Sequence, residues 1–402
     1  MINIPQYILN VLNVLYKHGY EGYLVGGCVR DALMGKEPHD FDLTTNAAPN
    51  EIISCFCNMK IIETGLKHGT VTVVSDGENV EITTYRIDGR YVDNRHPEEV
   101  VFTRDIHQDL SRRDFTVNAI AYSPRDGIVD IFGGMADIES RIIRCVGDPD
   151  ARFNEDGLRI MRAIRFSSVL GFDIDTGTSM SIHSNKHLLG NISAERIYSE
   201  LKKMICGLGV YDIFKNYYDV IFSVFPALAK YENQYNHNIK MISSLSPDAI
   251  VRFCALFYNM NISDIESSLK LLKPDNFLFN NVIRLSSVVT GKISCDDISV
   301  KYMMNKFEHE NIMRLTELKR NFDASFDSKA FLTVYNRLCD ENACVSIKQL
   351  DINGGDLLAL GVKKGPQIGD ILNKLLVEVI EGRCENKKEN LIEYANNIHS
   401  GI

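Results

Sequence analysis

The spacing of apolar residues changes near residue 150, and this change divides the chain into two parts of different fold. Before it, runs rich in β-branched residues, such as "TVTVV" at 70–74 and "VEITTYR" at 80–86, alternate with helical segments. Such alternation predicts strands and helices within one domain. After it, apolar residues recur at helical spacing, as in "EDGLRIMRAIRFSSVLG" at 155–171. The sequence therefore predicts an α+β fold, with a mixed α/β N-terminal part and an all-α remainder.

Local signals place the first elements along the chain. We expect a helix from Pro5 to Gly19, because proline is tolerated in a first helical turn and glycine ends helices. Glycine, proline and charged residues dominate 87–104, which predicts a long functional loop. The remaining predictions are strands at 23–27, 41–45, 70–74 and 80–86, helices at 28–35 and 48–56, and strands or turns in "VDIFGG" and "IIRCVG".

Two glycines, Gly26 and Gly27, lie between a predicted strand and a predicted helix. Glycine lets the backbone approach a bulky anion closely, and a helix N-terminus offers free N–H groups. Arg30 follows one turn later with a planar cationic fork. A tight turn is the alternative interpretation of the glycines alone. The pattern indicates an anion site, and the acidic residues that follow strengthen that interpretation.

Asp40 and Asp42 are two residues apart in "HDFDLTT", which reads as a strand. Residues at this spacing share one face of a strand, so Phe41 and Leu43 are expected to face a core. Two carboxylates beside a phosphate cradle suit Mg²⁺, which prefers oxygen ligands and bridges phosphates. A pair of metals there would serve nucleotidyl transfer. Glu81, in the neighbouring predicted strand, is the candidate third carboxylate, although a solvated strand residue is the alternative.

Four motifs together resemble a known family. "GGCVRDALMGKEPHDFDLTT", "SRRDFTVNAIAY", "NEDGLRIMRAIRF" and "SAERIYSEL" occur in the order found in bacterial class II tRNA nucleotidyltransferases, the CCA-adding enzymes. The C-terminal stretch "INGGDLLALGVKKGPQIGDILNKLLVEVIEG" is also similar, whereas 206–350 matches only in helical character. The resemblance implies a polymerase-β-type head and an elongated helical neck, body and tail. The expected domains are 1–140 (head), 141–205 (neck, with a nucleobase-selecting helix), 206–270 (body) and 271–402 (tRNA-binding tail).

The resemblance also implies roles for individual residues. Arg113, Asp114 and Asn118 in "RRDFTVNA" correspond to positions near the sugar and phosphates of a bound nucleotide. The alternative for this stretch is a helix-start cap at Asp114 with surface arginines. The enzyme would add C, C and A to the 3′ end of tRNA from CTP and ATP, using Mg²⁺ and no nucleic-acid template.

"EDGLRIMRAIRF" carries the expected base selection. Asp156, Arg159 and Arg162 recur every three residues on a predicted helix, and Arg165 continues the row. Cytosine and adenine both present an amino donor beside a ring-nitrogen acceptor, which an Asp–Arg pair matches. Uracil and guanine invert that pattern and would leave buried polar groups unpaired, at roughly 1–3 kcal/mol each. Arg162 and Arg165 are expected to bind phosphates or to fix the positions of the Asp–Arg pair relative to each other. A salt-bridged helix surface is the alternative.

Alternative functions share much of this pattern. The family's loop corresponding to 88–104 supports the final A addition, and its presence argues against a CC-only enzyme, though not against an A-adding one. A poly(A) polymerase shares the head, but "ETGLKHGTVTV" favours CCA addition. A non-catalytic RNA-binding protein would have no reason to crowd aspartates where RNA approaches. Extension of tRNA therefore remains the favoured activity.

Charge and composition restrict where RNA could bind. The net charge is −9. Residues 1–150 hold 14 Lys and Arg against 23 Asp and Glu, whereas the remainder is balanced. RNA binding must therefore come from local clusters, of which Lys202–Lys203, Lys363–Lys364 and Lys387–Lys388 are candidates. Each lysine pair alone is more typical of a solvent-exposed face. Backbone N–H groups of "LGVKKGPQIG" could contact a phosphate, but a turn between two helices is the favoured interpretation of this segment.

Cysteine usage and hydropathy indicate the compartment. The ten cysteines include no CxxC pair, which favours core thiols in a reducing cytosol. No window offers about 18 consecutive apolar residues, and the N-terminus lacks the pattern of a signal peptide. We therefore expect a cytoplasmic protein without a membrane partner. The sequence predicts no oligomeric state.

Overall fold

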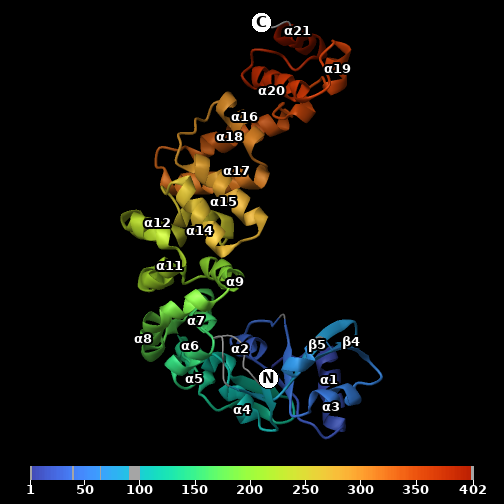
Figure 1. Cartoon of the computed structure of the whole chain (residues 1–402), viewed down its shortest axis with the longest axis vertical. Helices are drawn as coiled ribbons and strands as arrows, with labels where there is room; N and C mark the ends of the chain where they lie inside the picture. Colours follow the sequence, from blue (N-terminus) through green and yellow to red (C-terminus); the bar gives the residue numbers. More distant parts are fainter. Residues whose placement is uncertain (1, 39, 64, 90–99, 400–402) are drawn as a thin grey trace. The chain divides into compact units, whose positions relative to one another are not determined.

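The computed structural model describes residues 2–38, 40–63, 65–89 and 100–399. The chain divides into two compact units (Figure 1). The first comprises residues 1–239 and 267–274, and the second comprises residues 240–266 and 275–402. Helices α12 (Glu232–Ile242) and α14 (Ile262–Leu272) each cross a boundary between the units.

A seven-stranded sheet forms the N-terminal part of the first unit, with strand order β3-β4-β5-β2-β1-β8-β9. Neighbouring strands are antiparallel except β2 and β5, which are parallel. The strands are β1 (Tyr23–Val25), β2 (Asp42–Thr45), β3 (Lys60–Ile62), β4 (Thr70–Ser75), β5 (Glu78–Thr84), β8 (Ile120–Ser123) and β9 (Gly127–Asp130).

Side-chain alternation along the strands gives the sheet two different faces. Leu43, Val80 and Ile82 lie in one core, together with apolar residues of α1 and α3, and Figure 1 shows these helices beside β4 and β5. Tyr23 and Val25 face the other side and pack with α4. The helices around the sheet are α1 (Gln6–Lys17), α2 (Gly27–Leu33), α3 (Pro49–Cys55), α4 (Ile106–Ser111) and α5 (Gly134–Ser140), with the 3₁₀ turns η1 (Leu66–His68) and η2 (Thr116–Asn118).

Helices complete the first unit after residue 145. Helix α7 packs against α9 and α10, and α6 packs against α8. A short parallel pair, β10 (Ile142–Ile143) and β11 (Asp173–Ile174), links the two parts of this unit. The helices are α6 (Pro149–Glu155), α7 (Leu158–Leu170), α8 (Thr176–Asn185), α9 (Ala194–Ile205), α10 (Val210–Asn216) and α11 (Tyr218–Val224), with η3 (Lys186–Asn191) and η4 (Pro226–Tyr231).

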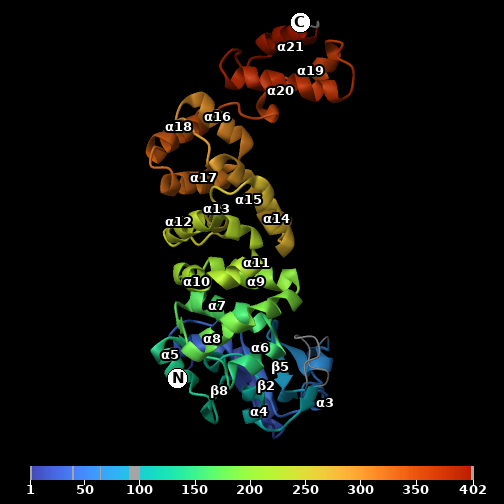
Figure 2. The same ribbon diagram turned by 60° about the vertical axis from the view of Figure 1, so that its left-hand side comes forward.

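The second unit is helical throughout its described residues (Figure 2). Four of its helices begin after an aspartate whose carboxylate accepts backbone N–H groups of the first turn, as expected for N-caps. Its helices are α13 (Ala249–Leu256), α15 (Asn276–Val289), α16 (Asp297–Lys306), α17 (His309–Phe322), α18 (Ser328–Asp340), α19 (Gly354–Ala359), α20 (Pro366–Ile380) and α21 (Lys388–His399), with η5 (Ile347–Gln349).

The predicted α+β class is confirmed, and one sequence-based element is corrected. Residues 87–104 were expected to form a loop throughout, but β6 (Arg86–Asp88) pairs with β7 (Val100–Phe102) in an antiparallel ladder. Val100, Val101 and Phe102 supply the β propensity that the polar composition of the segment obscured. Residues 90–99 of the expected loop lie outside the described residues. The stretch 360–365 joins α19 to α20, so its interpretation as a turn between helices is confirmed.

None of the described helices is long and apolar enough to cross a membrane. All ten cysteines are free thiols. Four of them are buried: Cys28, Cys145, Cys254 and Cys384.

Candidate active site

A cavity of about 530 Å³ opens beside strand β2 in the first unit and receives side chains from the sheet domain and from helices α7 and α9. Its volume lies in the range of small-molecule sites. Ten predicted site residues line it: Gly26, Gly27, Arg30, Asp40, Asp42, Arg113, Asp114, Asn118, Arg162 and Arg165. Residues more than 100 positions apart in the sequence thus meet in one place.

The two glycines form a bare part of the wall. Gly26 has φ = 76°, a left-handed conformation that side chains rarely adopt. A Cβ on Gly26 would lie 3.4 Å from Nη1 of Arg113, and one on Gly27 would lie 3.6 Å from Nη2 of Arg30. The glycines therefore keep the space beside two guanidinium groups open.

The carboxylates lie where strand β2 begins. Asp42 is the first residue of β2, and Asp40 precedes the strand rather than belonging to it. Phe41 and Leu43 pack in the core on the opposite face, as expected. Burial raises the pKa of Asp42 and the Asp40 carboxylate raises it further, while Arg113 acts in the opposite direction. Within the described residues, neither aspartate forms an ion pair or a side-chain hydrogen bond.

This donor set fits a hard cation. Two exposed, unpaired carboxylates two residues apart repel each other, and a divalent ion removes that repulsion. Among the described residues no group of three His, Cys, Asp or Glu side chains surrounds a common point. Further oxygen ligands would therefore come from the substrate's phosphates or from water. His39, next to this pair, lies outside the described residues.

Glu81 lies beside the carboxylates but not on the cavity. Its Cα pairs with that of Asp42 across the parallel β2–β5 ladder, so both side chains leave the same face of the sheet. Glu81 is exposed, and it is absent from the cavity lining. The geometry is compatible with a third carboxylate, and its role stays a prediction.

Arg30 and Asn118 form a buried pair at the base of the site. Nη1 of Arg30 donates to Oδ1 of Asn118 at 2.6 Å, and the same guanidinium contacts Asp31 at 2.8 Å. Asn118 belongs to the 3₁₀ turn η2, whose preceding residues bring Asp114 into the same wall. Helix α2 and the "RRDFTVNA" segment are thereby held together.

Asp114 joins the sheet domain to helix α7. Nε of Arg162 donates to its Oδ2 at 2.8 Å, and its Oδ1 accepts the backbone N–H of Phe115. Burial alone would raise the pKa of Asp114, but the adjacent Arg162 more than offsets this effect and lowers it. Asp114 is thus a buried carboxylate rather than the helix N-cap considered as the alternative, because the element that follows it is the 3₁₀ turn η2, whose N-cap is Phe115.

Phe166 is a functional candidate that the sequence analysis did not single out. The guanidinium carbon of Arg165 lies 3.5 Å from the centroid of the ring, and those of Arg30 and Arg162 lie 5.3 Å from it. An aromatic face attracts cations, so the Phe166 ring offsets part of the repulsion among these three guanidinium groups. The i, i+4 spacing of Arg162 and Phe166 was the available signal.

Helix α7 is shorter at its N-terminal end than the predicted nucleobase-selecting helix. Asp156 was expected on one helix face with Arg159 and Arg162, but it has an extended backbone between α6 and α7. Its carboxylate accepts the backbone N–H of Leu158 at 3.0 Å and pairs with Arg196 at 2.9 Å. The Asp-Gly sequence breaks the helix, because aspartate bonds its own following backbone more readily than it continues a helix.

Arg159 is on α7 but does not line the cavity. Its guanidinium is buried, pairs with Glu155 and donates to the carbonyls of Arg152 and Arg112. Glu155 thus fixes one side of the Arg159 guanidinium. Asp156 and Arg159 are fixed at the N-terminal end of α7, away from the wall formed by Arg162 and Arg165.

Two side chains of helix α9 extend the site beyond the predicted set. Glu200 is buried and accepts from Nε of Arg165 at 2.5 Å, and Lys203 lines the cavity. Glu200 lies in the motif "SAERIYSEL" and Lys203 in the Lys202–Lys203 pair, but neither signal assigned them to this cavity, because the packing of α9 against α7 brings them to the arginine row.

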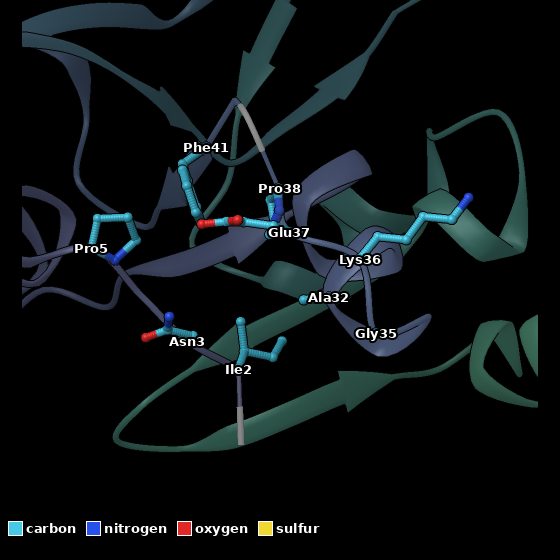
Figure 3. Close-up of a pocket in the computed structure, with 9 residues that line it drawn as sticks. All are labelled: Ile2, Asn3, Pro5, Ala32, Gly35, Lys36, Glu37, Pro38 and Phe41. Carbon is cyan, nitrogen blue, oxygen red and sulfur yellow. The ribbon is translucent and has the colours of Figure 1, made fainter.

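A second cavity, of about 640 Å³, has a different character (Figure 3). Its lining combines the N-terminal segment with the connection between α2 and β2, and it contains none of the predicted site residues. One lysine and one glutamate are its charged groups, so it lacks the paired carboxylates and arginine row of the first cavity. The lining residues are Ile2, Asn3, Pro5, Ala32, Gly35, Lys36, Glu37, Pro38 and Phe41.

Three family models match the chain in succession. The "Poly A polymerase head domain" matches residues 22–144, and the "Probable RNA and SrmB- binding site of polymerase A" matches residues 171–229. The "tRNA nucleotidyltransferase domain 2 putative" matches residues 248–395. The first match contains the glycines and the aspartates of the cavity.

Full-length relatives and solved structures agree with these matches. The CCA-adding enzyme of Ligilactobacillus salivarius is 36% identical over 98% of both chains, and that of Anoxybacillus flavithermus is 36% identical over 96% of both. The crystal structure of the Bacillus stearothermophilus CCA-adding enzyme in complex with CTP is 28% identical, with a TM-score of 0.80 over 98% of both chains. The Thermotoga maritima CCA-adding enzyme complexed with tRNA shares the fold, with a TM-score of 0.66 at 20% identity, over 98% of this chain and 96% of that one.

Proposed function

Because the chain belongs to the family of CCA-adding enzymes, we propose that it adds C, C and A in turn to the 3′ end of tRNA, from CTP and ATP. In each cycle the bond between the RNA 3′-oxygen and the α-phosphorus forms as the bond to pyrophosphate breaks. The observation that carries the proposal is the cavity in which Asp40 and Asp42 lie with four arginines. This reaction needs carboxylates for metal and cations for phosphates.

Asp40 and Asp42 would hold Mg²⁺, because they are unpaired and their oxygens suit a hard cation. When bound, a pair of such ions supplies Lewis-acid stabilisation of the phosphoryl oxygens and activation of the hydroxyl nucleophile. Glu81 would support the pair from the neighbouring strand. Burial and the neighbouring Asp40 raise the pKa of Asp42, which is consistent with a site built for a cation.

The chain's own cations bind the triphosphate and the sugar. Arg30, Arg162 and Arg165 surround Phe166, and Gly26 and Gly27 leave room for phosphate oxygens. Nε of Arg113 is buried and has no hydrogen-bond partner among the described residues. A buried donor without a partner is costly, so a substrate oxygen is its natural acceptor.

Base choice is assigned to Asp156 and Arg159. A carboxylate that accepts from an exocyclic amine and a guanidinium that donates to a ring nitrogen would select C and A over U and G. The present partners of these residues, Arg196 and Glu155, hold both side chains in fixed positions. Nucleotide binding would exchange these ion pairs for contacts with the base edge.

The cellular assignment follows from the substrate and the thiols. The ten cysteines are all free, which is the state expected in a reducing compartment. We therefore assign the protein to the cytoplasm, where tRNA matures. The helical second unit, which contains the match at 248–395, is the proposed tRNA-binding part.

A primer-extension gel tests the proposal. Three tRNAs, ending before CCA, after the first C and after CC, are incubated with each of CTP, ATP, UTP and GTP and Mg²⁺. The expected result is growth of all three to a CCA end when CTP and ATP are present, with UTP and GTP refused. Extension of the CC-ended tRNA alone would show an A-adding enzyme. Long A tails on any RNA would show a poly(A) polymerase, which the head-domain match at 22–144 makes the second candidate.

A further inference from the structure

Helix α9 carries two charged side chains, one turn apart, of which one lines the cavity and the other pairs with an arginine of its lining. Ile197, Leu201 and Met204 are buried on the apolar face of this helix, which packs against α7. Glu200 contacts Arg165, and Lys203 lines the cavity. Residues three apart on a helix are neighbours on its surface, so Lys203 lies next to the Glu200–Arg165 pair.

Each guanidinium of the cavity already has a carboxylate partner. Arg30 pairs with Asp31 at 2.8 Å, and Arg113 pairs with Asp109 at 3.2 Å. The same holds for Arg162 with Asp114, and for Arg165 with Glu200. These ion pairs fix the positions of the guanidiniums while they neutralise most of their charge.

Lys203 differs from these arginines. Within the part of the chain that the structure describes, its ammonium group forms no hydrogen bond or ion pair, and its side chain is exposed to the cavity. The other unpaired charges of the lining are the carboxylates of Asp40 and Asp42. The site thus holds two unmatched negative charges, proposed to hold metal, and one unmatched positive charge.

We propose that Lys203 is a phosphate-binding residue of the active site, whose ammonium group contacts a phosphate oxygen of the bound substrates. The proposal rests on the proposed nucleotidyl transfer. An ammonium on a flexible stem is a compact point charge that suits phosphate without requiring a planar, bidentate arrangement. Two substrates carry such groups: the triphosphate of the incoming nucleotide and the phosphodiester backbone of the RNA end.

The adjacent Lys202 provides a matched control. Of the Lys202–Lys203 pair, Lys202 keeps the solvated-face interpretation in this proposal, because its ammonium lies 5.6 Å from the ring of Tyr198 and it does not line the cavity. Both lysines are exposed and follow each other on the same helix. A general effect of surface charge would appear equally in K202A and K203A, whereas an active-site contact would appear only in K203A.

Steady-state kinetics test the proposal with wild type, K203A, K203R and K202A. The KM for ATP is measured on tRNA ending in CC, and the KM for that tRNA is measured at saturating ATP. We expect K203A to raise one of these KM values about tenfold or more, as loss of a charge-assisted contact does. K203R should recover most of the effect, and K202A should stay within about twofold of wild type. Circular dichroism and melting temperature verify that each variant folds.

The pattern of KM values identifies the phosphate. A rise confined to ATP assigns Lys203 to the triphosphate, and a rise confined to tRNA assigns it to the RNA backbone. Unchanged KM values in K203A, or equal losses in K202A, would overturn the proposal.

Binding of inorganic tripolyphosphate and of a CC-ended RNA oligonucleotide to each variant separates this proposal from the proposed function. If wild type failed to extend tRNA, the nucleotidyl-transfer assignment would fail. The binding measurements would still decide the role of Lys203, since weaker binding of either probe to K203A alone supports it and equal binding refutes it.

Discussion

Three properties of Asp42, which lines the cavity, bear on its role. It begins a strand, it lies two residues from a second aspartate, and burial raises its pKa. Arg113 is the nearby cation that opposes this shift. Asp42 is therefore a candidate ligand of a cation.

We predict that D42N abolishes nucleotide transfer while leaving the fold intact. Asparagine keeps the shape but removes the charge that holds the metal, so kcat should fall by about a hundred- to a thousandfold, as for other groups that stabilise transition-state charge. Single-turnover extension of CC-ended tRNA measures the effect. The control is E78Q, at the exposed start of β5. Activity of D42N within tenfold of wild type would contradict the metal assignment.

Glu81 gives a second prediction at this scale. It leaves the same sheet face as Asp42 but lies outside the cavity lining. We therefore expect E81Q to lower kcat by about tenfold, less than D42N, with unchanged KM for ATP, since a supporting carboxylate orients the metal rather than binding the nucleotide base. A loss as large as that of D42N would make Glu81 a direct ligand, and no loss would leave it a solvated strand residue.

Arg159 carries the prediction on base selection. R159A removes the proposed donor to the ring nitrogen, so the site should no longer penalise a base that presents an N–H there. The ratio of UTP to CTP incorporation should rise about ten- to a hundredfold, the equivalent of roughly 1–3 kcal/mol. R152A is the control, because Arg152 pairs with the same Glu155 at 2.7 Å. Identical incorporation profiles in R159A and wild type would refute the template proposal.

At the scale of elements, the β6–β7 hairpin is tied to the site through a buried acid. Asp109 on α4 is fully buried and accepts from Arg112 and Arg113, and also from the backbone N–H of Arg86 in β6. The carbonyl of Arg112 accepts in turn from Arg159. The Asp109 carboxylate therefore contacts β6 and Arg113 of the cavity directly, and it is connected to helix α7 through Arg112.

This arrangement predicts a pH-dependent stability effect. Burial alone would raise the pKa of Asp109, but Arg113 and Arg112 lower it below its ordinary value of 3.8. A depressed carboxyl pKa contributes stability that is complete above 3.8 and is lost as the pH falls through the folded-state pKa. D109N should therefore lower the melting temperature by about 6 °C or more at both pH 7 and pH 5, since breaking a buried pair costs roughly 3–5 kcal/mol.

Scanning calorimetry at pH 7, 5 and 3.5 measures this effect. The difference between D109N and wild type should be equal at the two higher values and smaller at pH 3.5, which lies below the ordinary pKa of 3.8, so that the unfolded wild-type chain already takes up a proton there. D212N, at an exposed position in α10, should change the melting temperature little at any of these values. A difference that grows toward pH 3.5 would contradict the assigned direction of the pKa.

Two elements also show where local signals failed. The spacing of Asp156, Arg159 and Arg162 predicted one helix, yet Asp156 stays extended because its side chain caps α7 and pairs with Arg196. The polar segment 87–104 predicted a loop, yet its ends pair as strands. At Asp156 a local bond to the following backbone outweighs the helical spacing, and at 87–104 strand pairing between distant residues outweighs the polar composition.

At the scale of the whole molecule, the distribution of charge governs how RNA would bind. Residues 1–150 carry the excess of acid, and the rest is balanced. A net negative protein gains no long-range attraction for a polyanion, so affinity must come from short-range contacts of individual lysines and arginines with phosphates. Such contacts displace counterions from the RNA.

We predict that tRNA affinity falls steeply with salt. Each phosphate contact lowers the slope of log K against log salt by about 0.7–0.9, so several contacts should weaken binding at least tenfold between 50 and 200 mM KCl. Fluorescence anisotropy with labelled tRNA measures the slope, and an uncharged osmolyte at matched osmolality is the control. A flat response would exclude the phosphate-contact view of RNA binding.

The sequence by itself determined the α+β class, most strands and helices of the first 150 residues, and the residue types of the site. These features depend on short-range properties: apolar periodicity, glycine conformations and closely spaced carboxylates. Tertiary structure alone decided which side chains meet. It brought Phe166 and Lys203 to the cavity, paired Glu200 with Arg165, and left Asp156, Arg159 and Glu81 outside the lining. The packing of α9 against α7 joins residues more than 30 positions apart, and such a contact depends on complementary surfaces that no local pattern encodes.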